Sequence, residues 1–155
     1  MKRNIARTTL ATIAFAVLVL GFTPAAQAAT CSTATVAGQW GLPLTGALIL
    51  PTGPVPAAAV LRATADVEGN ITGTEARNVG GGYADETLTG NWTVKPDCTG
   101  TAAANIYQSG QLVRVSVLSI VFDENSREVR MVQKSLPLPD GTQLPVVVTA
   151  EGKKH

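Results

Sequence analysis

The chain has few of the residues on which catalytic and nucleic-acid-binding sites most often depend. Among its 155 residues there is one histidine, His155, and charged residues make up 15% and aromatic residues 5%. A single histidine leaves no base for a Ser-His or Cys-His nucleophile. The few charges argue against a nucleic-acid-binding arm, and the shortage of Leu, Glu and Lys argues against a helical bundle. Glycine and proline, in contrast, number 15 and 9.

Residues 1–28 have the pattern of a secretory signal peptide. Three basic residues precede an apolar run over residues 10–22, and Ala26-Gln27-Ala28 supplies a cleavage site of the A-x-A type. The apolar run is shorter than the roughly 20 residues that a membrane-spanning helix needs. We therefore expect export to the periplasm or the cell exterior, with cleavage after Ala28 and no stable membrane span in the mature protein.

Cleavage at this point predicts one domain over residues 29–150 and a flexible basic tail over residues 151–155. The domain and tail together carry nine basic and eleven acidic residues, a formal charge of −2. Without a basic patch outside the tail, we expect no nucleic-acid partner.

The two cysteines, Cys31 and Cys98, both lie in the exported part of the chain. In an oxidising compartment two cysteines most simply form one disulfide. No CxxC spacing and no third ligand accompanies them, which argues against a redox or metal pair. A bridge that closes so long a loop stabilises a domain by about 4 kcal/mol in the chain-entropy account.

Short segments of alternating polarity, separated by turn residues about every ten positions, predict an all-β domain. In the clearest one, Leu88, Gly90, Trp92 and Val94 share one face. Residues 67–70 are expected to form a hairpin turn, and Pro145 marks an edge or closure point in the last strand. The expected strands cover residues 35–50 (one or two strands), 57–66, 70–77, 85–95, 101–108, 111–122, 127–134 and 143–150.

About eight strands with short connections and no long crossover favour an antiparallel up-and-down barrel. A two-sheet β-sandwich is the alternative. Closure removes the exposed strand edges on which a secreted β-protein would aggregate. An outer-membrane barrel does not suit the composition, because too few aromatic residues remain outside the signal peptide for two girdles.

Two segments are expected to be irregular. Residues 48–56 are apolar and rich in proline, which predicts a loop that packs on the surface or caps one mouth of the barrel. Residues 78–83 are rich in glycine but lack the strand and helix that a phosphate-binding loop needs, so we expect a flexible connection.

The charged residues predict no catalytic or metal site. The acidic pairs are expected in turns, where solvent keeps carboxylates ordinary and the oxygens are too few for Ca²⁺. Arg114 is the one charge within an apolar strand, and we expect it to face solvent rather than to point inward as an anion anchor. No catalytic residue, metal or cofactor is therefore predicted. The acidic pairs are Asp66/Glu68, Asp85/Glu86 and Asp123/Glu124.

Several motifs resemble a known group of proteins. Gly38-Gln39-Trp40, Leu88-Thr89-Gly90-Asn91-Trp92 and Asp97-Cys98-Thr99-Gly100-Thr101 resemble the GxW…LTGxYxV…DCTGT pattern of small, secreted, mostly uncharacterised bacterial proteins. The resemblance implies an antiparallel barrel of calycin-like or allene-oxide-cyclase-like type and no known activity. Gly38-Gln39-Trp40 is also similar to the lipocalin Gly-x-Trp, which implies that Trp40 plugs the narrow end of the barrel.

Three functions remain open. A hollow barrel would bind a small hydrophobic ligand, with Trp40, Trp92, Tyr107 and Met131 as candidate lining residues, although core packing is the alternative role for each. A barrel filled with side chains would act through its surface as an envelope-associated interaction module. A cyclase-type barrel enzyme is the third hypothesis. An internal void below about 150 Å³ would exclude ligand binding, whereas ligand pockets are typically a few hundred Å³.

Overall fold

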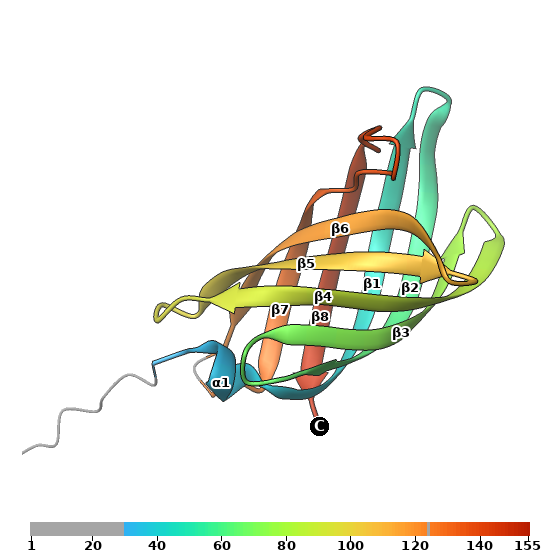
Figure 1. Cartoon of the computed structure of the whole chain (residues 1–155). Helices are drawn as coiled ribbons and strands as arrows, with labels where there is room; N and C mark the ends of the chain where they lie inside the picture. Colours follow the sequence, from blue (N-terminus) through green and yellow to red (C-terminus); the bar gives the residue numbers. More distant parts are fainter. Residues whose placement is uncertain (1–29, 124) are drawn as a thin grey trace, which may run out of the picture.

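The computed structural model describes residues 30–123 and 125–155, so the predicted signal peptide over residues 1–28 lies outside the described residues. Eight antiparallel strands in this part of the chain form one closed up-and-down barrel (Figure 1). Each strand pairs with the next, and β8 pairs with β1 to close the sheet. The predicted barrel is thus confirmed over the sandwich. The strands are β1 (Gly38–Leu50), β2 (Gly53–Ala65), β3 (Asn70–Val79), β4 (Gly82–Val94), β5 (Thr99–Gln108), β6 (Gln111–Phe122), β7 (Glu128–Ser135) and β8 (Val146–Lys154).

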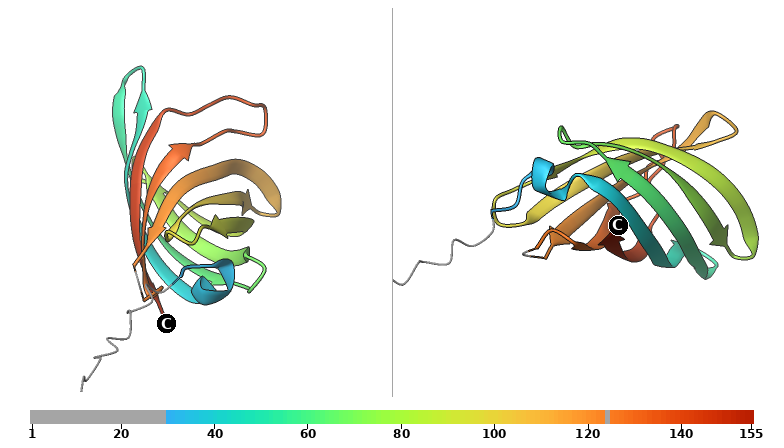
Figure 2. Two further views of the ribbon diagram at one scale, coloured as in Figure 1. Left: turned by 90° about the vertical axis from the view of Figure 1, so that its left-hand side faces the viewer. Right: turned by 90° about the horizontal axis from the view of Figure 1, so that it is seen from below.

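The two ends of the barrel differ (Figure 2). One end, called the closed end below, carries the short helix α1 (Thr33–Val36) and the turns that follow β2, β4 and β6. The opposite end, called the hairpin end, carries the β1–β2 hairpin, the turns that follow β3 and β5, and the connection from β7 to β8. No helix among residues 30–123 and 125–155 is long and apolar enough to cross a membrane.

The closed end is filled by an aromatic cluster. Trp40, Trp92 and Phe122 are at most 3% exposed, and their ring centroids lie 5.4–5.9 Å apart in edge-to-face contacts, an arrangement that aromatic rings favour. Small residues make room for the indole rings, because Ala63 pairs with Trp40 and Ala102 pairs with Trp92 across the sheet. This half of the barrel is therefore a packed core.

The segment before β1 covers the closed end. The predicted disulfide between Cys31 and Cys98 is present and ties this segment to the turn between β4 and β5. A capping box between Ser32 and Thr35 starts α1, and the Trp40 Nε1 donates a hydrogen bond of 3.0 Å to the Val36 carbonyl. Trp40 is fully buried beneath this cover.

The proline-rich segment over residues 48–56 differs from its prediction as a loop. It continues β1 and β2 as a regular hairpin, in which Leu48 pairs with Val55 and Leu50 pairs with Gly53. The prolines at positions 54 and 56 are tolerated because β3 pairs with β2 only from Ala57 onward, so their missing N–H groups interrupt no ladder between β2 and β3.

The glycine-rich segment over residues 78–83 is also more regular than predicted. Asn78 pairs with Tyr83 and Val79 with Gly82, which leaves a tight turn at Gly80 and Gly81. Both glycines have positive φ, 57° and 92°, as two-residue hairpin turns require. The segment is therefore a hairpin turn and not a flexible connection.

The end of the chain is the third difference. Residues 151–154, expected as part of a flexible tail, belong to β8. Lys153 and Lys154 pair with Gly41 and Trp40 of β1, and Lys153 also pairs with Glu128 of β7. The segment is ordered because its backbone completes the closure of the barrel.

Candidate functional site

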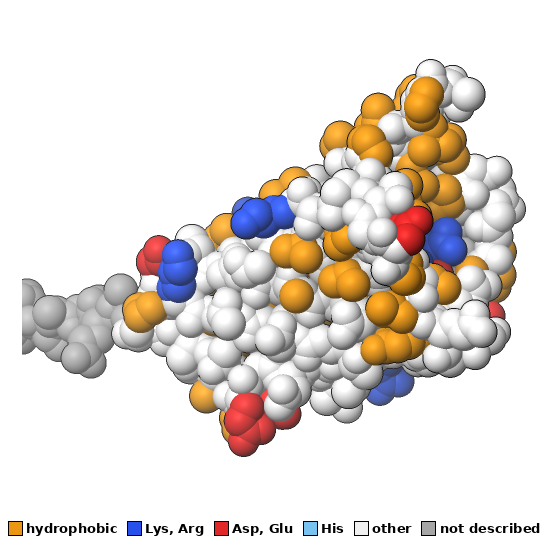
Figure 3. Space-filling model, turned by 45° about the horizontal axis from the view of Figure 1, so that its top comes forward, with side chains coloured by type: hydrophobic (Ala, Val, Ile, Leu, Met, Phe, Trp, Pro, Cys, Tyr) orange, Lys and Arg blue, Asp and Glu red, His pale blue; other side chains and the backbone are white. Residues whose placement is uncertain are grey.

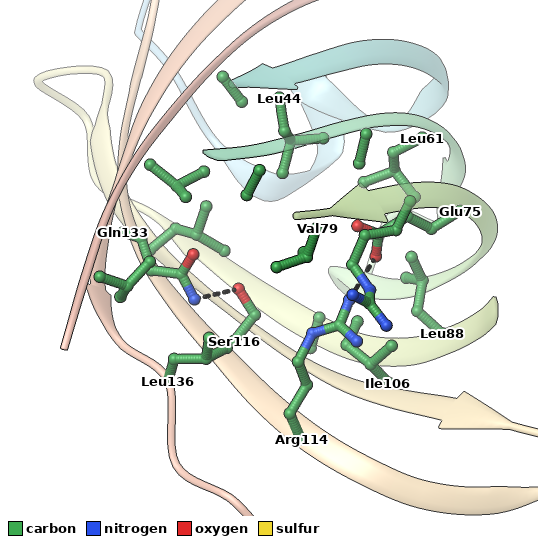
Figure 4. A pocket seen from close by; sticks show the side chains of 18 of the residues that line it. Leu44, Leu61, Glu75, Val79, Leu88, Ile106, Arg114, Ser116, Gln133 and Leu136 are labelled. Carbon is green, nitrogen blue, oxygen red and sulfur yellow. Dashed lines mark hydrogen bonds and ion pairs between the residues drawn. The ribbon is translucent and has the colours of Figure 1, made fainter. Parts of the chain in front are cut away.

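The hairpin half of the barrel is hollow. It contains a cavity of about 270 Å³ whose lining comes from all eight strands and from the β7–β8 connection (Figure 4). Small side chains on the inward face, Ala57 and Ala59 of β2 and Ala104 of β5, leave this space open. The larger apolar side chains that line it are Leu42, Leu44, Leu48, Leu61, Val79, Leu88, Ile106, Val113, Leu118, Met131, Leu136, Leu138, Leu144, Val146 and Val148.

The cavity is surrounded by further apolar surface. In the view that brings the hairpin end forward, hydrophobic side chains gather on the projecting β1–β2 hairpin and continue toward the middle of the molecule (Figure 3). Leu48 and Val146, which pair between β1 and β8, lie at this end and line the cavity. An apolar molecule that approaches the hairpin end thus meets apolar side chains before it reaches the interior.

Four charged side chains lie together in this half of the barrel. Glu75 and Glu86 occupy directly opposed positions on β3 and β4, and their residues are 8% and 3% exposed. Two carboxylates at directly opposed positions on neighbouring strands repel one another. Arg77 of β3 and Arg114 of β6 supply the compensating charges.

Glu86 is the central acceptor of this ionic cluster. The Arg114 Nη1 and Nη2 donate to its two carboxylate oxygens at 2.7 Å each. The Arg77 Nε and Nη2 donate to the same oxygens at 3.0–3.2 Å. Glu75 receives one hydrogen bond from the Arg114 Nη2 at 3.1 Å, and Figure 4 shows the two side chains pointing toward one another at the cavity.

The pKa values of the two carboxyl groups are shifted in opposite directions. Burial opposes ionisation of Glu86, but the hydrogen bonds and the positive charges of Arg114 and Arg77 together outweigh burial and lower the pKa of Glu86. Burial raises the pKa of Glu75; Arg114 and Arg77 offset this only in part, and the neighbouring Glu86 charge adds to it. Like-charge pairs in a shared site commonly separate in this way. Glu86 is therefore the fixed anion of the cluster, and Glu75 is the group that takes up a proton more readily.

The inward direction of Arg114 corrects the prediction that it faces solvent. In the register of β5 and β6, Ile106 pairs with Arg114 and Tyr107 pairs with Leu112, so Val113 is an extra residue at a bulge. Bulges re-aim side chains next to functional sites, and both Val113 and Arg114 line the cavity here. Since Arg114 has buried carboxylates as partners, its charge is compensated inside the barrel.

Glu86 corrects a second prediction. The sequence suggested that Asp85 and Glu86 lie in a turn and are solvated, but both lie within β4. The strand begins at Gly82 because the turn before it is tight, and the alternation of β4 directs Glu86 inward with Leu88 and Trp92 while Asp85 stays exposed. The signal available in the sequence was that Glu86 shares the parity of the apolar face.

A second polar pair lies elsewhere on the cavity wall. The Gln133 Nε2 donates to the Ser116 Oγ at 3.0 Å and to the Ser135 carbonyl at 3.2 Å. Figure 4 shows Gln133 and Ser116 apart from the Glu75–Arg114 pair. The cavity thus combines a mainly aliphatic wall with two separate polar patches, of which one is charged.

The candidate ligand-binding residues occupy three different environments. Met131 lines the cavity, whereas Trp40 and Trp92 belong to the aromatic cluster of the closed end. Tyr107 lines a second hollow together with Arg62, Glu75 and Glu86. The Trp92 Nε1 is buried and has no hydrogen-bond partner among the described residues. Ligand binding by these residues stays a prediction, and of the four only Met131 is placed to contact the contents of the cavity.

The described residues contain no group of three or more His, Cys, Asp or Glu side chains that could hold a metal ion. Comparisons of the sequence with protein-family models and with curated proteins find no match. The site defines a small β-barrel with a part-hollow, mainly apolar interior that contains a compensated ionic cluster.

Proposed function

We propose that the protein is exported and binds a small hydrophobic molecule inside its barrel. The observation that carries the proposal is the cavity of about 270 Å³ in the hairpin half. Ligand sites are typically concave, mainly apolar and equipped with a few polar groups, from about 300 Å³ upward. Because a cavity of about 150 Å³ accommodates benzene, this one suits a ligand with on the order of ten non-hydrogen atoms.

Export rests on the signal-peptide pattern and gains support from the disulfide. Disulfides persist in oxidising compartments and are rare in the cytosol, and the Cys31–Cys98 bridge joins two distant parts of the fold. We also propose, on the motifs quoted above, that the chain is related to the small secreted bacterial proteins with calycin-like or allene-oxide-cyclase-like barrels.

The division of the interior favours ligand binding over a surface module with a filled core. A module of that kind needs no internal space, yet only the closed end is packed with aromatic side chains. Empty volume in a protein interior lowers stability. A cavity that is retained at this cost is more consistent with an occupant than with a purely structural barrel.

The test compares two phenylalanine substitutions on neighbouring residues of β5. Ala104→Phe fills the cavity, whereas Ala103→Phe projects to the opposite face of the sheet. We expect isothermal titration calorimetry with 1-octanol to detect binding to the wild-type protein and to Ala103→Phe, and at least tenfold weaker binding to Ala104→Phe.

Equal binding to the two variants would place the ligand outside the cavity, and absence of binding to the wild-type protein would overturn the proposal. Native mass spectrometry of the protein isolated from its own source provides an independent check, because a retained natural ligand should appear as an added mass.

A further inference from the structure

The ionic cluster is asymmetric in a way that matters for a ligand. The Glu86 side chain is completely covered, while the side chains of Arg114 and Arg77 are 12% and 25% exposed. Both arginines and Glu75 line the cavity. The space inside the barrel is therefore bordered by two guanidinium groups. Their main counterion, Glu86, is itself covered and cannot be reached from solvent.

The contacts within the cluster also differ in how easily they can be replaced. Glu86 accepts hydrogen bonds from both arginines through both of its oxygens. Glu75 accepts a single bond from Arg114. Bidentate contacts between guanidinium and carboxylate groups are the stronger kind. Of the two carboxylates, Glu75 is the one that another anion could displace from Arg114.

We propose that the cavity takes an amphiphile, an apolar chain with an oxyanion at one end, and that this oxyanion replaces ionised Glu75 at Arg114 and is also attracted by the charge of Arg77. The proposal rests on ligand binding in the barrel as proposed above and adds the chemical class of the ligand. The chain occupies the aliphatic part of the cavity, and Glu75 takes up a proton from solution as the anion enters.

Proton uptake follows from the groups that face Glu75. These are Arg77 on its own strand, Glu86 on β4 and Arg114 on β6. Burial already raises the pKa of Glu75. A second anion at Arg114 would weaken the hydrogen bond that Glu75 accepts there and add repulsion, so protonation of Glu75 becomes still more favourable. The protonated carboxyl group can then donate a hydrogen bond to the ligand.

A cationic ligand meets the opposite situation. It would have to compete with Arg114 for Glu75 and would lie beside two guanidinium groups. A neutral ligand would gain only burial of its chain. The expected order of affinity for chains of equal length is therefore anion, then alcohol, then cation.

The experiment uses 1-octanesulfonate, 1-octanol and octyltrimethylammonium as probes, each titrated calorimetrically into the full protein. The sulfonate stays ionised across the pH range, so any proton taken up belongs to the protein. We expect it to bind at least tenfold more tightly than the alcohol. We also expect proton uptake, measured by repeating the titration in buffers of different ionisation enthalpy, and tighter binding at pH 5 than at pH 8.

Two substitutions with matched surface controls test the residues. Glu75→Gln should strengthen sulfonate binding severalfold at pH 8 and abolish proton uptake, with no change for octanol. Arg77→Gln should weaken sulfonate binding about tenfold. Glu151→Gln and Arg130→Gln remove the same charges from an exposed pair, with side chains 81% and 79% exposed, and should leave both affinities within twofold.

The possible failures are distinguishable. If octanol binds in the cavity and the sulfonate binds no more tightly, or if Glu75→Gln alters neither the preference nor the proton uptake, the oxyanion site is wrong and ligand binding stands. If none of the three probes binds to the wild-type protein, the proposed function itself is wrong.

Discussion

Glu75 and Glu86 show how two identical side chains acquire different properties a few ångströms apart. They face each other across two strands of the same sheet, and the arginines are distributed unequally between them. Glu86 is held by both guanidinium groups and its pKa is lowered against the effect of burial. Glu75 has one such contact, and burial raises its pKa. The placement of Arg114 opposite Ile106, next to the bulge at Val113, decides this division.

This difference predicts how stability depends on pH. The pKa of Glu75 in the folded protein is above its usual value of 4.5, so the stabilisation from its protonated form is present below that value and is lost as the pH rises through the raised pKa. Glu75→Gln keeps the side chain neutral and escapes this loss. Its Tm relative to the wild-type protein should therefore rise between pH 4 and pH 8, as measured by calorimetry.

The exposed variant Glu151→Gln provides the control, since its Tm difference from the wild-type protein should stay nearly constant over the same range. The acid side of the wild-type curve reflects Glu86 as well, because a lowered pKa contributes stability that is lost as the pH falls. A Tm difference for Glu75→Gln that does not change with pH would show that Glu75 titrates normally.

At the scale of the elements, the position of the segment that contains α1 depends on the disulfide between Cys31 and Cys98. A four-residue helix is too short to be stable alone, and three features hold α1 in place: the capping box, the hydrogen bond from Trp40, and the disulfide from Cys31 to the β4–β5 turn. Val36, at the end of α1, is completely buried. The helix thus covers the aromatic cluster at the closed end.

Removal of the disulfide should therefore destabilise the protein strongly. The double variant Cys31→Ala/Cys98→Ala opens a loop of sequence separation 67, for which the chain-entropy account predicts a loss of about 4 kcal/mol in the free energy of unfolding. Urea denaturation followed by tryptophan fluorescence measures the loss. Ser32→Ala, which removes only the cap of α1, should cost about 1 kcal/mol. A double variant no less stable than Ser32→Ala would contradict the structural role of the bridge.

The whole molecule divides into a packed half and a hollow half on one continuous sheet. Tryptophan and phenylalanine side chains fill the closed end, and alanines face the interior toward the hairpin end. The outer surface carries several exposed valines, as is normal for the surface of a folded protein. The exposed ones include Val60, Val121, Val132 and Val147.

Because the two halves are packed differently, the removal of three side-chain carbon atoms should lower the free energy of unfolding by a different amount in each half. Ile120 is 1% exposed in the packed half, so Ile120→Ala should lower the free energy of unfolding by about 3–4 kcal/mol. Leu48 is half-buried and lines the existing cavity, so Leu48→Ala should cost no more than about 1–2 kcal/mol. Chemical denaturation checks both values. Equal costs would indicate that the hairpin half is as tightly packed as the closed end.

Local patterns in the sequence were sufficient for much of the architecture. Alternation of polarity located the strands, Gly and Asp residues located the turns, and the two cysteines predicted their bridge, because each of these features depends on neighbouring residues or on simple pairing. The strand from Gln111 to Phe122 is predicted correctly, but the prediction that Arg114 faces solvent is wrong, because Arg114 and Ser116 face the cavity.

The sequence by itself determined that this chain is an all-β domain of antiparallel strands with one disulfide, and it favoured a barrel over a sandwich, since periodicity and turn chemistry are local. Only the tertiary structure decided that Glu75, Glu86 and Arg114 meet inside it. These residues lie on three strands, and their contact depends on the register of β3 with β4 and on the bulge in β6. The turn between β3 and β4 sets the register that places Glu75 opposite Glu86, but Arg114 reaches them from β6, a strand that pairs with neither β3 nor β4. No single segment therefore contains the information that brings the two carboxylates and the arginine together.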